Sequence, residues 1–70
     1  MAKVRSEVAG SVWKIEVEVG QLVSEGESLI IVESMKMEIP IEAPCAGTVA
    51  EILVKDGEAV AEGAVVAVLR

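Results

Sequence analysis

The chain lacks several residues on which common active sites and metal sites depend. Among its 70 residues there is no His, Phe or Tyr, and there is only one Cys and one Trp. Without His, neither a Ser-His-Asp triad nor a Cys-His pair can form. A single Cys without His builds neither a zinc site nor a disulfide framework. We therefore expect no catalytic residue and no metal site within this chain.

Basic residues and long apolar runs are also scarce. Six Lys and Arg stand against twelve Asp and Glu, which gives a formal net charge of -6. Nucleic-acid binding depends on Lys and Arg to neutralise phosphates, and single-strand binders add aromatic stacking platforms. No apolar run approaches the roughly 20 residues of a membrane-spanning helix, and residues 1–5 are not followed by an apolar signal core. The composition predicts a cytoplasmic protein that binds neither nucleic acid nor membrane.

What the chain does contain favours strands. Apolar residues make up 53% of the sequence, and most of them are Val (thirteen), Ala (nine) or Ile (six). Branching at Cβ restricts side-chain freedom in a helix but suits the pleated surface of a sheet. No stretch shows the helical period together with capping residues. We expect one all-β domain spanning residues 1–70.

The sequence also repeats itself with an offset of 37 residues. Aligning residues 3–33 with residues 40–70 gives nine identities in thirty-one positions. The identical pairs include Gly10 with Gly47, Gly20 with Gly57, and Gly26 with Gly63, with no gap between them. Because glycine supplies positive φ or close backbone approach, coincident glycines indicate shared turns. The repeat predicts two copies of one β unit related by a pseudo-two-fold axis.

Each copy divides into four short strands. Strict alternation places Ile15, Val17 and Val19 on one face of a strand. Val12 and Val49 each precede the isoleucine of their copy by three residues, an odd number, so alternation would place them on the opposite face. The same irregularity in both copies predicts a β-bulge between the Gly turn and Ile15 or Ile52. Eight strands in two interlocked halves predict a flattened barrel or sandwich. The expected strands are residues 4–8, 12–19, 22–23, 29–32, 41–45, 49–54, 59–60 and 65–69.

Residues 34–39 have no counterpart in the repeat. They join the last strand of the first copy to the first strand of the second, so we expect a tight hairpin tip there. The tip contains no Gly, Asn, Asp or Pro, although those residues dominate such turns. A strained non-glycine turn costs on the order of 1–3 kcal/mol and tends to persist at functional sites. On spacing alone, Lys36 is either an ordinary solvent-exposed residue of a turn or a functional residue that the turn presents.

The tip resembles a known motif. Glu33-Ser34-Met35-Lys36-Met37-Glu38-Ile39 is similar to the biotinylation motif of the biotin carboxyl carrier family, which has Met-Lys-Met at the hairpin between two quasi-symmetric halves. The resemblance covers nearly the whole chain and extends to Gly10-Ser11-Val12 and Gly47-Thr48-Val49. It is nearest to the small free-standing biotin/lipoyl attachment proteins, which also carry Trp-Lys in the place of Trp13-Lys14. It implies a barrel-sandwich hybrid of two quasi-symmetric four-stranded halves.

By this resemblance Lys36 is the acceptor of a covalent biotin, attached by a biotin protein ligase. In the family, a biotin carboxylase uses ATP and bicarbonate to carboxylate the biotin, and a carboxyltransferase passes the carboxyl group on. The resemblance therefore implies a monomeric, non-catalytic carrier that these enzymes act upon. Arg in place of Lys36 would not serve, because a guanidinium stays protonated.

The resemblance also assigns roles to residues around Lys36. Met35 and Met37 form an apolar collar that a ligase or carboxylase recognises, unless they pack back on the sheet. Related lipoyl domains present Asp-Lys-Ala at this place, so the two Met residues favour biotin over lipoate. Weaker candidates are Glu33, Ser34 and Glu38, where the acidic side chains form either a solvated rim or an electrostatic contact with the ligase.

Some interpretations stay open. A lipoyl carrier or an unmodified structural barrel-sandwich domain would share the fold, and the parent carboxylase and its acceptor substrate stay open. Residues 17–21 leave no room for the protruding thumb of some larger carriers, and the chain is either free-standing or an excised domain. We expect Cys45, which aligns with Val8, to be buried and reduced. Trp13 aligns with Ala50, so it either packs over the sheet or contacts a partner.

Overall fold

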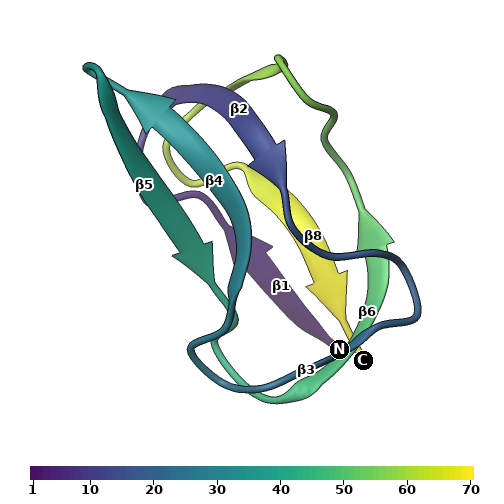
Figure 1. Cartoon of the computed structure of the whole chain (residues 1–70). Helices are drawn as coiled ribbons and strands as arrows, with labels where there is room; N and C mark the ends of the chain where they lie inside the picture. Colours follow the sequence, from purple (N-terminus) through teal and green to yellow (C-terminus); the bar gives the residue numbers. More distant parts are fainter.

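Eight short strands and no helix make up the fold in the computed structural model, which describes residues 1–70 (Figure 1). The all-β prediction is confirmed. With no helix, none is present that is long and apolar enough to cross a membrane. The strands are β1 (Ala2–Arg5), β2 (Gly10–Ile15), β3 (Leu22–Val23), β4 (Ser28–Ser34), β5 (Met37–Glu42), β6 (Gly47–Ile52), β7 (Ala59–Val60) and β8 (Val65–Leu69).

The strands form two four-stranded antiparallel sheets that face each other. One sheet has the order β1-β8-β6-β3 and the other the order β5-β4-β2-β7. Each sheet takes two strands from each copy of the repeat, so the halves interlock as predicted. Figure 1 shows the two layers with the β4–β5 hairpin extending at one end and both chain termini at the other.

The pseudo-two-fold of the sequence is present in the backbone. The bounds of β2 and β6 are offset by 37 residues, as are those of β3 and β7. Hydrogen bonds between the copies also repeat: the amide of Gly20 donates to the carbonyl of Val49, and that of Gly57 to the carbonyl of Val12, both at 2.7 Å. Gly20 and Gly57 have φ of 93° and 84°, which a side chain would strain. The shared glycines therefore mark shared turns.

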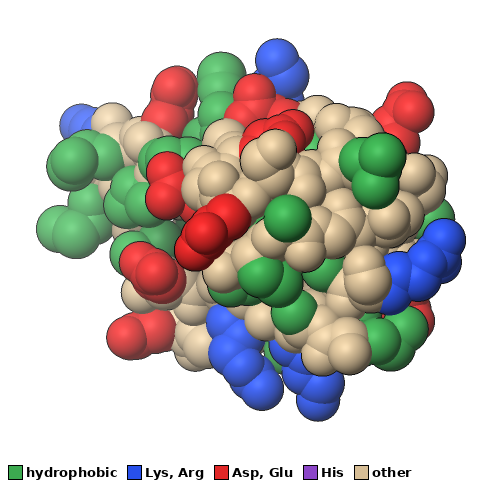
Figure 2. All heavy atoms as spheres, turned by 90° about the horizontal axis from the view of Figure 1, so that it is seen from below, with side chains coloured by type: hydrophobic (Ala, Val, Ile, Leu, Met, Phe, Trp, Pro, Cys, Tyr) green, Lys and Arg blue, Asp and Glu red, His purple; other side chains and the backbone are tan.

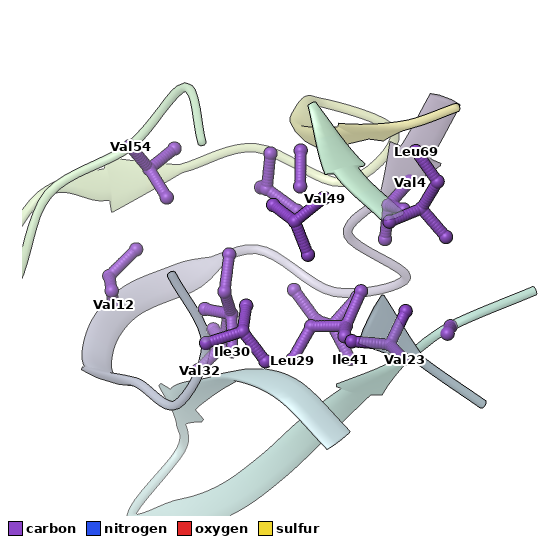
Figure 3. Packing of buried hydrophobic residues seen from close by; sticks show 14 of the residues in the cluster. Val4, Val12, Val23, Leu29, Ile30, Val32, Ile41, Val49, Val54 and Leu69 are labelled. Atoms are coloured by element: carbon purple, nitrogen blue, oxygen red, sulfur yellow. The ribbon is translucent and has the colours of Figure 1, made fainter. Parts of the chain in front are cut away.

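The core lies between the two sheets and is entirely aliphatic apart from Ser6. Fifteen apolar residues are buried in one cluster. Figure 3 shows side chains of β4, such as Ile30, directed toward Val49 of the opposite layer. The Ser6 hydroxyl donates a 2.6 Å hydrogen bond to the carbonyl of Val8, and no buried side-chain polar atom lacks a partner. Close packing of branched side chains supplies the stability that so short a chain needs.

The predicted bulge is confirmed in both copies. The register of β2 against β4 shifts between Val12 and Lys14, and that of β6 against β8 shifts between Val49 and Glu51. A bulge places one extra residue on the bulged strand, which reverses the parity of the residues after it. Val12 is therefore buried although alternation from Ile15 would turn it outward.

The predicted strand bounds were partly wrong. The first strand of each copy begins earlier than expected and ends at Arg5 or Glu42, and β2 ends at Ile15. Val17 is buried, but Val19 is 61% exposed, so the predicted common face of Ile15, Val17 and Val19 is wrong at its last member. The reason is that the chain leaves the sheet after Ile15 and turns at Gly20 toward the other layer.

The expectation that Cys45 is buried was also wrong. Its side chain is exposed and free, whereas Val8, its counterpart, is half-buried. Strand β5 ends at Glu42, and Ala43 is the last buried residue before residues 44–46, which form an exposed bend. One difference between the copies lies here: the Ser6 hydroxyl hydrogen-bonds to both the carbonyl and the amide of Val8, whereas Ala43, at the equivalent position, has no hydroxyl to hold Cys45.

Candidate functional site

The unduplicated segment forms the tip of the β4–β5 hairpin. Strand pairing continues through Glu33 opposite Glu38 and Ser34 opposite Met37, which leaves Met35 and Lys36 as a two-residue loop. Met35 has φ of 51° and Lys36 has φ of 65°, and they are the only non-glycine residues with positive φ. Positive φ at both central positions is the requirement of a type I′ turn, normally met by Asn-Gly. The predicted strained tip is confirmed.

The base of the hairpin is held firmly by its neighbours. Strand β4 lies between β2 and β5, and Val32 near its end is fully buried. Gly10 of β2 lies against the same end of β4, where an added Cβ would overlap the carbonyl oxygen of Glu33 and crowd Val32. This close approach explains why a glycine occupies the position. The hairpin therefore presents its tip from a fixed base.

Lys36 is exposed at the tip and unengaged. None of the side-chain hydrogen bonds of the structure involves its amine. Its neighbours Met35 and Met37 are 92% and 64% exposed, so neither packs back on the sheet. The tip thus offers a primary amine between two flexible apolar side chains, an arrangement that suits covalent attachment of an acyl group and contact with an enzyme.

Acidic side chains lie directly below the tip. Glu33 and Glu38 are both exposed and face each other across the hairpin, while Ser34 is half-buried. Like charges directly opposite each other destabilise a strand pair. Figure 2 shows that acidic side chains are spread widely over the face seen from below, with basic ones at its margins. The rim of the tip is therefore acidic in a protein that is acidic as a whole.

Two other surface features lie away from the hairpin tip. A hollow of about 230 Å³ lies between β1 and β5, and no pattern in the sequence pointed to it. Trp13 is 50% exposed, which leaves half of the indole available for contact. No group of three or more His, Cys, Asp or Glu side chains is placed to hold a metal ion. The hollow is lined by Arg5, Glu7, Val8, Ile39, Pro40, Ile41, Glu42, Ala43 and Pro44.

Comparison with known sequences identifies relatives over nearly the full length. The model of the family described as "Biotin-requiring enzyme" matches residues 1–69. The biotin/lipoyl attachment protein of Bacillus subtilis is 46% identical over 57 residues, which cover 81% of this chain and 78% of that protein. The biotinylated protein TB7.3 homolog of Mycobacterium leprae is 39% identical over 66 residues, 94% of this chain and 93% of that protein.

Comparison with solved structures finds the same fold inside a much larger enzyme. The urea carboxylase of Kluyveromyces lactis superimposes with a TM-score of 0.95 and 39% sequence identity. The match covers 99% of this chain but only 6% of the urea carboxylase chain. The fold described above is therefore found both in small proteins and as a minor part of a carboxylase.

Proposed function

The chain belongs to the family of biotin-requiring enzymes, and from this premise we propose that it is a carrier with biotin covalently attached to Lys36. The observation that supports this most directly is the turn itself. An exposed amine without a protein partner stands on two strained non-glycine residues at the end of an otherwise regular hairpin. Asn-Gly would form the same turn with less backbone strain, so folding alone does not explain Met35-Lys36 at these positions. The strain is explained if presentation of Lys36 is what the turn is for.

The attachment step is amide formation. A biotin protein ligase supplies biotinyl-adenylate, and Nζ of Lys36 in its neutral form attacks the acyl carbon. A C–N bond forms, the acyl–phosphate C–O bond breaks, AMP leaves with the electron pair, and the proton of Nζ passes to a base. The product lacks the ammonium charge of Lys36, so the formal net charge falls by one from -6.

The role of this chain is then to bind and orient rather than to catalyse. Biotin, when bound, supplies a ureido nitrogen that carries a carboxyl group between the active sites of a biotin carboxylase and a carboxyltransferase. The unbranched stem of Lys36 provides length, and the buried base of β4 keeps its point of attachment fixed. A site on paired strands is held more precisely than one on a mobile loop.

The residues around Lys36 serve recognition in this proposal. The exposed Met35 and Met37 give the ligase adaptable apolar contacts on either side of the acceptor amine. Glu33 and Glu38 add an acidic rim that guides basic groups of an enzyme to this end, and Ser34 lies at the last strand pair before the turn. The two Met residues are also what favours biotin over lipoate.

The experiment is intact-mass analysis after incubation with biotin, ATP and a biotin protein ligase. We expect an increment of one biotinyl group on the wild type and none on Lys36→Arg. Lys55→Arg is a matched control, since Lys55 is also an exposed lysine in a loop, and it should be modified fully. No increment on the wild type, or an increment that survives Lys36→Arg, would contradict the proposal. An increment seen only with lipoate and its ligase would replace biotin by lipoate.

A further inference from the structure

The methionine residues of this chain are concentrated at the hairpin tip. The duplicated frame, residues 3–33 and 40–70, contains no Met, and two of the three Met residues of the chain are Met35 and Met37. We propose that oxidation of these two residues to methionine sulfoxide blocks biotin attachment at Lys36 and that their reduction restores it. This inference rests on the proposed attachment to Lys36 and adds a redox-controlled modification site beside it.

The frame shows that apolar contacts in this protein do not require methionine. All fifteen apolar residues of the buried core are Val, Ile, Leu or Ala. At the tip, by contrast, the apolar side chains on both sides of Lys36 are thioethers. A thioether differs from those hydrocarbons because it is oxidised reversibly under mild conditions. The tip therefore has a chemical property that the core of the frame lacks.

Both methionine side chains are open to small oxidants. Met35 is 92% exposed and Met37 is 64% exposed. Oxidation of a buried Met disrupts the core around it, because an apolar side chain becomes polar. No Met is buried in this protein, so oxidation changes the surface of the tip without removing a core contact. The modification therefore acts on recognition by an enzyme and leaves the fold intact.

The oxidant is hydrogen peroxide. The sulfur lone pair attacks one peroxide oxygen, an S–O bond forms and the O–O bond breaks. The second oxygen leaves as hydroxide, which takes the proton of the new S–OH group to give water. The sulfur loses two electrons and the peroxide gains them. Methionine sulfoxide reductases reverse the step with a dithiol, which becomes a disulfide while the sulfoxide oxygen leaves as water.

The sulfoxide alters the tip in two ways that both oppose amide formation. The apolar contacts that Met35 and Met37 give the ligase become polar, and the loss of one buried methionine contact is worth about tenfold in kcat/KM. A sulfoxide oxygen also accepts hydrogen bonds, and the side chains of residues 33–38 that donate them are those of Ser34 and Lys36. A hydrogen bond from the Lys36 amine to a sulfoxide holds the nucleophile away from the acyl carbon.

The other sulfur-containing side chains lie away from the tip and serve as internal references. Met1 is 89% exposed at the opposite end of the molecule (Figure 1). Cys45 is exposed and free in the bend that follows the far end of β5. Oxidation at either place leaves Met35 and Met37 unchanged, so it should not affect biotin attachment.

The test measures biotin attachment before and after oxidation of protein that carries Cys45→Ser, which excludes thiol oxidation. The protein is treated with hydrogen peroxide, catalase removes the excess, and peptide mass analysis verifies one added oxygen on each of Met35 and Met37. We expect kcat/KM of the biotin protein ligase to fall at least about tenfold. Methionine sulfoxide reductases A and B, one for each sulfoxide epimer, with dithiothreitol should restore the initial value.

Two comparisons separate the effect of the tip from indirect effects. The double variant Met35→Leu with Met37→Leu, also carrying Cys45→Ser, keeps Met1 as its last sulfur. Peroxide should leave kcat/KM of this variant at its starting value, whatever that value is. Urea unfolding of the Cys45→Ser protein should give the same free energy of unfolding before and after oxidation, because no core contact is lost. If the double variant is a poor ligase substrate, restoration by the reductases still decides.

Failure of this redox control is distinguishable from failure of the proposed function. Oxidised protein that is biotinylated as fast as untreated protein would overturn the inference, and so would an equal loss of rate in the double Leu variant. A loss that the reductases do not reverse, or that accompanies unfolding, would be damage and would overturn it too. In each case untreated protein still gains one biotinyl group on Lys36, whereas absence of that group would contradict the proposed function itself.

Discussion

The two ends of the molecule have equivalent strand pairs, but a turn joins the two strands at only one of them. At one end β4 and β5 are joined through Met35 and Lys36, while at the equivalent place β8 ends at the C-terminus and β1 begins at the N-terminus (Figure 1). The pairing of Ile39 with Val32 matches that of Ala2 with Leu69, so both strand pairs keep the same register. The β8–β1 pair forms without any connecting turn. The strained loop is therefore not required to assemble the frame.

The glycines at the two ends show the same contrast. A Cβ on Gly10 would overlap the carbonyl oxygen of Glu33, inside the joined hairpin. On Gly47 it would lie 2.8 Å from the carbonyl oxygen of Arg70, the last residue of the chain. The first oxygen belongs to β4, which has a strand on both sides, whereas the second, at the end of β8, accepts a 2.9 Å hydrogen bond from the amide of Thr48. An added Cβ therefore meets a closer overlap at Gly10, with both Glu33 and Val32, than at Gly47.

The largest difference between the ends is expected from adding one methyl group to each. Overpacking typically costs 1–3 kcal/mol, and we expect Gly10→Ala to lower the free energy of unfolding by about 3 kcal/mol and Gly47→Ala by about 1 kcal/mol. The measurement is urea unfolding of both variants beside the wild type. Equal losses would show that both overlaps are equally hard to relieve and would remove the contrast.

A smaller effect is expected from relieving the turn. Asn tolerates positive φ better than Met, so Met35→Asn should raise the free energy of unfolding by about 1 kcal/mol, measured by thermal unfolding. The same variant should lower kcat/KM of the biotin protein ligase, because the exposed Met35 side chain is lost.

Met35→Ala is the matched control for that variant. It removes the same contact but keeps the strain, so it should slow the ligase without gaining stability. If Met35→Asn is no more stable than Met35→Ala, the turn carries no strain that asparagine relieves. The joined end then differs less from the other end than the positive φ of Met35 and Lys36 indicates.

The smallest effect concerns the acidic pair below the tip. Glu38→Gln removes the repulsion across the hairpin and should raise the free energy of unfolding by about 0.5 kcal/mol at low salt, with the gain disappearing at high salt. Glu42→Gln, on the same strand but opposite Ser28, serves as the control and should gain nothing. A gain that does not depend on salt would mean that charge repulsion is not its cause.

Much of the frame was predictable because its signals are local and occur twice. Glycines at matching positions marked the turns at Gly20 and Gly57, and the shared parity error at Val12 and Val49 marked the bulges. The hairpin tip was identified by subtraction, since residues 34–39 were what the repeat left over. These features depend on backbone conformation, which neighbouring residues largely determine.

The features that the sequence did not predict depend on where the chain leaves a sheet. Alternation continued to Val19, although the strand ends at Ile15, because a pattern of apolar residues persists in a segment that crosses between layers. Cys45 was misplaced because the hydrogen bonds that Ser6 makes to Val8 have no counterpart in the second copy. The proximity of Trp13, Ile31 and Pro40 was not predicted either, since these residues become neighbours only through strand pairing.

The position of the two termini determines how this molecule can be tethered. Both lie at the end opposite the hairpin tip in Figure 1, and the molecule is 30 Å long. A second domain fused to either terminus would be attached at the end opposite the hairpin tip and would leave Lys36 accessible. In such a fusion, rotation of the whole domain about the connecting segment would carry Lys36 along an arc whose radius is set by the length of the molecule.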